Sequence, residues 1–285
     1  MNEVDIPAWV AQAADRTQRS FREAVHIILD GIGHSQELQA KMVMKGGLLM
    51  AIRYDSTRYT RDIDFSTNAP YVAVEAEQLL AELEQQLALA TDRLPYATMC
   101  RLQSSAIVPK GENKTHQTLA LKIGYADMTN DRAVQRLQAK TSANVVEIDY
   151  SYNEVVFDVE VVELEGGVTI HTYSLRNVIA EKLRSLLQQP IRKRNRRQDV
   201  YDICLLLESG EPLHEEDLAV IHQMLLVSSR SKGIEPEVGS MEHAAVVSMA
   251  REGYESLQAD IEGELLPFTQ AISKVQRLYR SLPWK

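Results

Sequence analysis

The sequence predicts an α+β protein in which a mixed α/β half is followed by an all-helical half. Two observations support this prediction. Stretches rich in β-branched residues crowd the middle of the chain, at Thr98–Val108, Thr118–Tyr125, Val145–Tyr152 and Val155–Leu164. Beyond Thr172 the apolar residues recur at helical spacing instead. We therefore expect two domains, over residues 1–170 and 171–285.

The elements of the first half follow from local patterns. Residues 7–31 have the spacing of one amphipathic helix that ends at Gly31 and Gly33, and residues 41–52 predict a short element, a Gly-Gly turn and a helix. Residues 61–65 alternate as a strand does, and Leu79, Leu83 and Leu87 mark a helix over residues 74–90. In the last β-rich stretch, one face is expected to carry Val155, Phe157, Val159 and Val161.

The second half begins at Ser174, a plausible N-cap for a helix that Pro190 is expected to end. Further helices are predicted over residues 200–207, 215–227, 242–256 and 266–282.

Composition limits the class of protein. The apolar fraction is 45% and the charged fraction 25%, as in soluble globular proteins. No apolar stretch reaches the roughly 18 residues of a membrane helix, and the acidic N-terminus lacks the apolar core of a signal peptide. Only Cys100 and Cys204 occur, without paired spacing. We expect a soluble, cytoplasmic protein without a disulfide scaffold.

A basic run opposes the overall charge. The chain has 31 basic and 40 acidic residues, a net charge of −9, which argues against indiscriminate nucleic-acid coating. Five of the six residues from 192 to 197 are nevertheless cations: Arg192, Lys193, Arg194, Arg196 and Arg197. The run is either a solvated loop or a contact for RNA or triphosphate, and its position between two motif-bearing helices favours contact.

The segment with the most specific chemistry lies between residues 45 and 65. Asp62 and Asp64 are two apart on a predicted strand, so both carboxylates share a face. Two such charges need a cation, and Mg²⁺ prefers hard oxygen ligands. Gly46-Gly47 lets the backbone approach a phosphate closely. A phosphate-binding turn beside metal-binding carboxylates predicts a nucleotidyl-transfer site.

These residues resemble a known family. Gly46-Gly47 followed by Arg58-x-Thr60-x-Asp62-Ile63-Asp64-Phe65 resembles the AbiEii/AbiGii nucleotidyltransferase toxins, members of the DNA polymerase β-like superfamily. The spacer of 14 residues between Gly47 and Asp62 is toward the long end for the superfamily. The resemblance implies a polymerase-β-like mixed sheet with flanking helices, and a C-terminal helical bundle that completes the active-site cleft.

The resemblance also implies a third carboxylate on a neighbouring strand. Asp149 is the best candidate, with Glu147 on the same face as the alternative. Asp158 and Glu160 form a decoy pair on the next strand.

Two motifs of the second half resemble the family as well. Ala180-Glu181-Lys182 resembles its Ala-x-Lys motif, and Arg197-Gln198-Asp199-Val200-Tyr201-Asp202 its later Arg/Asp motif, interrupted here by Gln198. Lys182 is expected on the polar flank of its helix, from which it could reach a triphosphate. Asp199 and Asp202, three apart, are neighbours on one helical face, and one of them could orient Lys182 or contact the nucleotide.

The mechanism implied by the resemblance assigns roles to these residues. Two Mg²⁺ ions would bridge Asp62, Asp64 and Asp149 to the α-phosphate of a nucleoside triphosphate, which would be attacked in line by a hydroxyl. Lys182 and Asp202 complete the expected catalytic set. Nucleotide contacts are expected from Lys45, Gly46, Gly47, Arg58, Thr60, Lys182 and Asp199. Substitution of Asp62, Asp64 or Lys182 by Ala is expected to abolish transfer and leave the fold intact.

The biological role is implied by the same resemblance. The acceptor would be RNA, with the tRNA 3′ end as the leading candidate, so that transfer would block translation. A winged-helix antitoxin partner, a type IV toxin–antitoxin pair and phage defence are implied too. Two alternatives stay open: modification of a protein hydroxyl or small molecule, and a catalytically inactive nucleotide-binding partner module.

Overall fold

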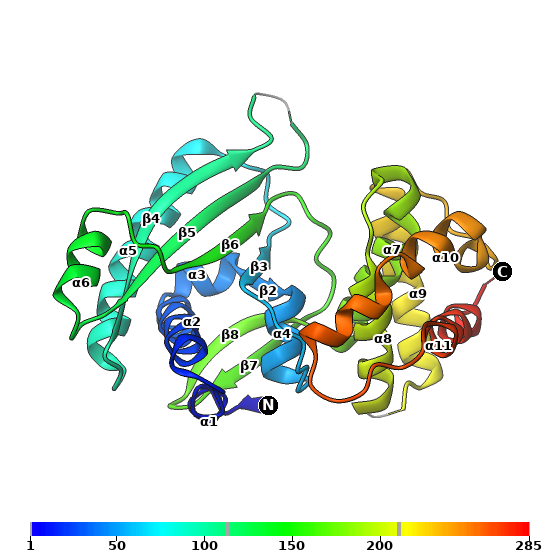
Figure 1. Ribbon diagram of the computed structural model, residues 1–285. Coiled ribbons are helices and arrows are strands. Elements are labelled where there is room, and N and C mark those ends of the chain that lie inside the picture. Colours follow the sequence, from blue (N-terminus) through cyan, green and yellow to red (C-terminus); the bar gives the residue numbers. More distant parts are fainter. Residues whose placement is uncertain (1, 112–113, 210–211, 285) are drawn as a thin grey trace. The chain divides into compact units, whose positions relative to one another are not determined.

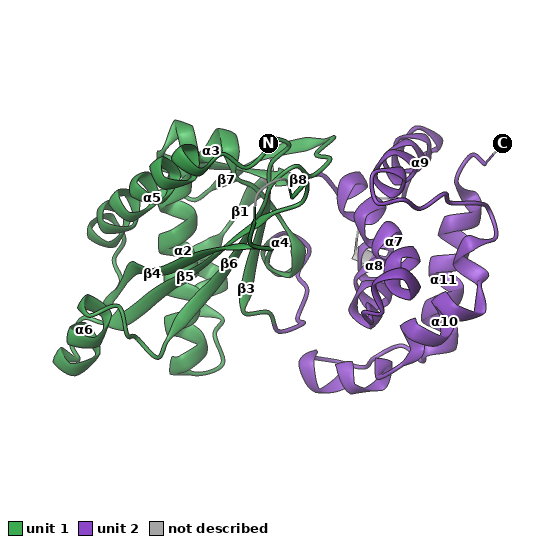
Figure 2. Ribbon diagram, turned by 90° about the horizontal axis from the view of Figure 1, so that it is seen from above, with its two compact units in different colours: residues 1–52, 60–172 green, residues 53–59, 173–285 purple. Residues whose placement is uncertain are grey.

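The structure is a computed structural model that describes residues 2–111, 114–209 and 212–284. Its described chain divides into two compact units (Figure 2). The first unit contains residues 1–52 and 60–172, and the second contains residues 53–59 and 173–285. The expected division at residue 170 thus missed one segment, Arg53–Tyr59, which belongs with the helices.

The first unit is built on a mixed eight-stranded sheet in the order β1-β7-β8-β2-β3-β6-β5-β4 (Figure 1). Its strands are β1 (Asn2–Val4), β2 (Val43–Lys45), β3 (Asp62–Ser66), β4 (Thr98–Val108), β5 (Thr118–Asp127), β6 (Val145–Ser151), β7 (Val159–Leu164) and β8 (Val168–Tyr173). Its helices are α1 (Ile6–Ala11), α2 (Arg16–His34), α3 (Gln36–Lys41), α4 (Gly46–Arg53), α5 (Ala73–Arg93) and α6 (Asp131–Gln138). The predicted α+β class is confirmed.

The buried side of this sheet explains why its central strands form. In β3 and β6, apolar residues alternate with polar ones, so Ile63, Phe65, Ile148 and Tyr150 enter the core. Helix α2 packs on α5 and β4 and contributes its own buried face. The opposite, polar face of β3 and β6 is thereby left to carry the acidic side chains.

The first predicted helix was wrong in its extent. The segment forms two helices, because Asp15 adopts an extended backbone and is the N-cap of α2. Its carboxylate accepts a hydrogen bond from the N–H of Gln18 at 2.8 Å. Nor does Gly33 end the helix. A Cβ there would lie 2.3 Å from Val168 Cγ1, so the glycine allows β8 to approach α2.

The fourth β-rich stretch also differs from its prediction. Strand β7 begins only at Val159, and its buried residues are Val162 and Leu164. Phe157, Val159 and Val161, which were expected on one face, are 37%, 40% and 44% exposed, so these side chains are not part of the core.

The second unit is helical. It contains α7 (Leu175–Arg192), α8 (Arg197–Ser209), α9 (Glu215–Arg230), η1 (Ser240–Glu242), α10 (Ala244–Arg251), η2 (Tyr254–Asp260) and α11 (Phe268–Ser281). The predicted helix over residues 242–256 is therefore broken into three pieces. Gly253, with φ +68, separates the last two.

Helix α7 confirms its predicted start and not its predicted end. The hydroxyl of Ser174 accepts a hydrogen bond from the N–H of Asn177 at 3.1 Å. Pro190 does not stop the helix. Proline has no N–H to donate to the carbonyl of Leu186, four residues earlier, and this carbonyl accepts a hydrogen bond from the side-chain amide of Gln189 at 3.0 Å instead. Among the described residues, no helix is long and apolar enough to cross a membrane.

Candidate active site

The first set of candidate residues lies on three neighbouring strands of the sheet. Asp62 and Asp64 point to the same face of β3, as their spacing predicted, while Ile63 between them is buried. Asp64 is in register with Asp149 on β6, which runs parallel, and with Lys45 on β2, which runs antiparallel. Three acidic residues of the prediction are therefore brought to one face of one sheet. We call Asp62, Asp64 and Asp149 the sheet carboxylates.

Gly46 is required by the position of Asp64. Its φ is +76, and a Cβ on it would lie 2.0 Å from Asp64 Oδ2. No residue with a side chain fits this space. Gly46 and Gly47 do not form a separate turn, because they are the first residues of α4. The N–H groups of that first turn have no partner within the helix and can bind an anion.

The two candidates for the third carboxylate have different surroundings. Asp149 stands beside Asp64, whereas Glu147 stands beside Asp62 and pairs with Lys122 at 3.0 Å. Both are exposed. A neighbouring hydroxyl, that of Thr60, donates to Asp62 Oδ1 at 2.8 Å.

The chemistry of the sheet carboxylates fits a divalent ion. They supply hard oxygen donors on adjacent strands, the ligand type that Mg²⁺ prefers. Within residues 2–111, 114–209 and 212–284, no three His, Cys, Asp or Glu side chains converge as a ready-made metal site. Like charges repel one another, so a cation would have to draw these carboxylates together.

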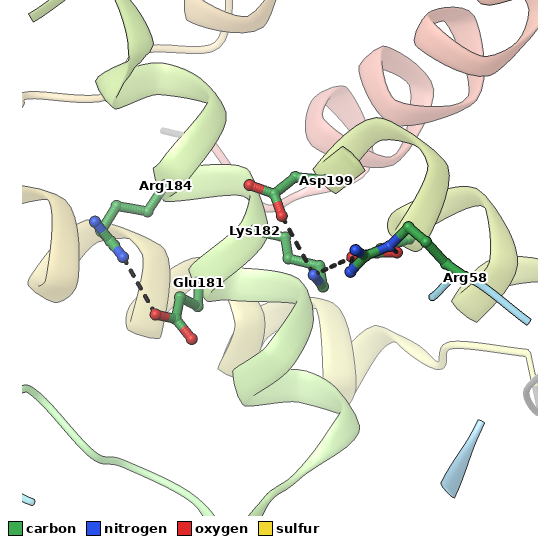
Figure 3. Close-up of polar contacts among 6 residues, drawn as sticks. Arg58, Glu181, Lys182, Arg184 and Asp199 are labelled. Atoms are coloured by element: carbon green, nitrogen blue, oxygen red, sulfur yellow. Dashed lines mark hydrogen bonds and ion pairs between the residues drawn. The ribbon is translucent and has the colours of Figure 1, made fainter. Parts of the chain in front are cut away.

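The second set of candidate residues forms a buried cluster within the helical unit (Figure 3). The Nζ of Lys182 on α7 donates to Asp202 Oδ2 at 2.6 Å and to Asp199 Oδ1 at 3.3 Å, both on α8. The Arg58 guanidinium donates to Asp202 through Nε at 3.1 Å and through a terminal nitrogen at 3.2 Å. We call Arg58, Lys182, Asp199 and Asp202 the helical cluster.

The polar flank of α7 that carries Lys182 is buried. Lys182 is only 8% exposed. The reason is that it packs between α7 and α8, where two carboxylates balance its charge. Asp199 and Asp202, the predicted neighbours on one helical face, both reach it.

The two aspartates differ in their electrostatics. Burial alone raises the pKa of Asp202, but the charges of Lys182 and Arg58 outweigh it and hold the pKa below the usual value. For Asp199 burial prevails over Lys182 and Arg196, so its pKa is raised. Burial lowers the pKa of Lys182, yet the two carboxylates more than compensate and raise it.

The basic run is divided between surface and interior. Arg192, Lys193 and Arg194 are exposed, whereas Arg196 and Arg197 are half-buried. The side-chain amide of Asn195 donates to the carbonyls of Met249 and Glu252, each at 2.6 Å, and so ties the loop to the end of α10.

One contact of the site could not be found by sequence reasoning. Arg58 was expected beside the nucleotide and Asp202 among the catalytic groups, but nothing indicated that they pair. They are 144 positions apart, and no local pattern encodes such a contact.

Comparison with protein families gives a match over most of the chain. The family described as "Nucleotidyl transferase AbiEii toxin, Type IV TA system" matches residues 28–277. Among solved structures, JHP933 from Helicobacter pylori is similar with a TM-score of 0.46 and 11% identity, over 95% of this chain and 93% of that one. A "putative nucleotidyltransferase" from H. pylori has a TM-score of 0.37 and 12% identity, over 87% of this chain and 100% of that one. No curated protein matches the chain.

Proposed function

The chain belongs to the AbiEii family of nucleotidyltransferase toxins of type IV toxin–antitoxin systems, and on this premise we propose that it transfers a nucleoside monophosphate from a nucleoside triphosphate to RNA with the help of Mg²⁺. The acceptor we propose is the 3′ end of tRNA. Modification of that end would stop aminoacylation and hence translation. The family is one of enzymes, which favours a catalyst over an inactive nucleotide-binding module.

The observation that carries the proposal is the packing of Asp64 against Gly46. The carboxylate occupies the space of the missing Cβ, beside the N-terminus of α4 and in register with Asp149. A phosphate bound by the first N–H groups of that helix would thus lie next to metal-binding oxygens. This is the arrangement that nucleotidyl transfer needs.

The proposed chemistry divides between the two sets of residues. The sheet carboxylates would hold Mg²⁺, which when bound neutralises phosphate charge and lowers the pKa of an attacking hydroxyl. We propose that Asp149 serves as a ligand or accepts the proton of that hydroxyl. Lys182 would contribute positive charge to the phosphates, and the attacking oxygen would displace pyrophosphate from the α-phosphorus.

The exposed cations of the basic run support a nucleic-acid acceptor. Arg192, Lys193 and Arg194 extend into solvent at the end of α7, within a chain of net charge −9. Such a strip attracts a polyanion locally, while the acidic remainder repels it. We propose that it contacts the tRNA backbone. We propose further that the toxin acts in the cytoplasm, where a cognate winged-helix antitoxin restrains it, and that the pair serves in phage defence.

Labelling with radioactive nucleotides tests the proposal. The purified protein is incubated with Mg²⁺, total tRNA and each of the four α-³²P-labelled ribonucleoside triphosphates, with Asp64→Asn as the inactive control. Label on tRNA that nuclease P1 releases and that Asp64→Asn does not produce supports the proposal. Label on protein alone would instead favour modification of a protein hydroxyl, and label on neither would reject both.

A further inference from the structure

Arg58 and Lys182 share a single carboxylate, and they share it unequally. Asp202 is fully buried, and each of its oxygens accepts one bond from the Arg58 guanidinium. Its Oδ2 also accepts the shorter bond from Lys182 Nζ. Such a two-pronged arginine–carboxylate contact is geometrically specific, and it occupies most of the acceptor capacity of Asp202.

Lys182 is left with capacity for another partner. An ammonium has three N–H groups, and Asp199 and Asp202 take two of them. No third acceptor for Lys182 is found in the described part of the chain. Beside it, Asp199 Oδ2 is buried without a hydrogen-bond partner. The cluster is therefore incomplete on the side of Lys182 and Asp199.

The charge of the cluster depends on Arg58. Two cations and two carboxylates sum to zero when all four are ionised. Without Arg58 the sum becomes −1, in a buried place where charge acts strongly. Among the described residues of the cluster, Lys182 would then be the one cation hydrogen-bonded to the two carboxylates, with Arg196 acting on Asp199 alone and without a hydrogen bond in the cluster. Such a net negative setting repels a polyphosphate.

The backbone of the Arg58 segment has its own attachments. The N–H of Tyr59 donates to the carbonyl of Asp260 at 2.8 Å. The hydroxyl of Thr57 donates to the carbonyl of Glu262 at 3.2 Å and accepts from its N–H at 3.1 Å. The segment therefore stays in the helical unit without the guanidinium, and the role of Arg58 is more than to anchor it.

We propose that Arg58 is a positioning residue that acts through Asp202 on Lys182. By balancing Asp202, it leaves the Lys182 ammonium with net attraction for the phosphates of a nucleoside triphosphate. This inference rests on the proposed function for its substrate. It differs from the expectation that Arg58 contacts the nucleotide itself, because a guanidinium held by Asp202 need not leave its carboxylate to act.

Three variants separate charge from geometry. Arg58→Gln removes the charge, Arg58→Lys keeps the charge without the two-pronged contact, and Arg58→Gln combined with Asp202→Asn restores the balance with neutral groups. The matched control is Arg184→Gln. Arg184 is a buried arginine, held on the same helix as Lys182 by Gln188 at 2.8 Å and Glu181 at 3.4 Å, and directed away from the cluster (Figure 3).

The measurement is binding of inorganic triphosphate in the presence of Mg²⁺ by titration calorimetry, with thermal unfolding in parallel. We expect Arg58→Gln to weaken binding on the order of tenfold or more. Arg58→Lys should have a smaller effect, and the double variant should recover a large part of the binding that Arg58→Gln loses. Arg184→Gln should leave binding unchanged. In the transfer assay, Arg58→Gln should raise KM for the nucleotide more than it lowers kcat.

Each other outcome overturns the inference. If Arg58→Gln binds triphosphate as tightly as the wild type, Arg58 does not act on Lys182. If the double variant is no better than Arg58→Gln, Arg58 contacts phosphate directly or serves only the fold, and the unfolding curves tell these two apart. A wild type that binds no triphosphate also overturns it. Triphosphate binding without transfer to any acceptor would contradict the proposed function alone.

Discussion

The sheet and the helical unit both carry aspartates of the site, but these aspartates differ in their exposure to solvent. On the sheet, Asp62 and Asp149 are exposed to solvent and share a face with the half-buried Asp64. In the helical cluster, Asp199 and Asp202 are buried, and the counter-charges are side chains of the protein itself.

This difference in exposure determines how much each set of carboxylates contributes to the stability of the fold. Exposed carboxylates contribute little to folding, because water solvates them, and they remain able to bind a cation from solution. Buried carboxylates depend on permanent partners, and removing one partner leaves an uncompensated charge. Substitutions on the sheet should therefore affect chemistry, and substitutions in the cluster should affect stability as well.

The largest expected effect is on the stability of Lys182→Met. Loss of one partner of a buried ion pair costs about 3–5 kcal/mol, and here two carboxylates lose their shared partner. This differs from the sequence-based expectation that Lys182 can be replaced without harm to the fold. Urea unfolding measures the effect, with Lys193→Met, an exposed lysine in the next loop, as control. Equal midpoints for the two variants would show that the cluster does not hold the helices together.

The next largest effect is on catalysis by Asp149→Asn. Transfer should fall on the order of 10²–10³-fold, as when one electrostatic group of an active site is removed. The free energy of unfolding should change by less than about 0.5 kcal/mol, because the side chain is exposed.

Glu147→Gln is the matched control for Asp149→Asn, being two residues away on the same strand and face, with Lys122 as its partner. It should retain transfer. If Glu147→Gln is inactive and Asp149→Asn is active, the third carboxylate is Glu147.

A smaller effect should distinguish the two sets by their response to Mg²⁺. A ligand that binds the folded protein at 100 times its Kd adds about 2.7 kcal/mol to stability. Saturating Mg²⁺ should therefore raise the Tm of the wild type and of Asp199→Asn, and not that of Asp149→Asn. A Tm that responds to Mg²⁺ in Asp149→Asn as in the wild type would place the cation elsewhere.

The two sets also differ in how far the sequence predicted them. The shared face of Asp62 and Asp64 follows from strand alternation, and the shared face of Asp199 and Asp202 from helical spacing, because both patterns are local. The pairing of β3 with β6 is not local, and the prediction of Asp149 rests on the resemblance to a family.

Long-range contacts account for what the sequence did not predict. The burial of Lys182 arises from the packing of α8 on α7, and Arg58 meets Asp202 only because its segment joins the helical unit. Strand β1 was missed for the same reason, because it is three residues long and its partner β7 lies far away in the chain. Strand β8 was also missed, although one of its two neighbours in the sheet, β7, directly precedes it in the chain.

The smallest expected effect is the pH dependence of the two buried aspartates. The pKa of Asp202 is lowered in the folded protein, so its contribution to stability is present at neutral pH and is lost as the pH falls through the folded value. The pKa of Asp199 is raised, which favours the folded state only at low pH and opposes it once the group must ionise. At pH 7, Asp202→Asn should therefore lose about 1.5–3 kcal/mol, the range for a hydrogen bond to a charged group. Asp199→Asn should be as stable as the wild type or more stable.

Urea unfolding between pH 3 and 8 measures the change in stability of both variants and checks its sign in each. The difference in the free energy of unfolding between Asp202→Asn and Asp199→Asn should become smaller below pH ~4, where aspartates protonate in the unfolded chain. A loss of stability at pH 7 that is equal in both variants would mean that Lys182 holds the two carboxylates alike. The unequal sharing of Asp202 between Lys182 and Arg58 would then have no energetic consequence.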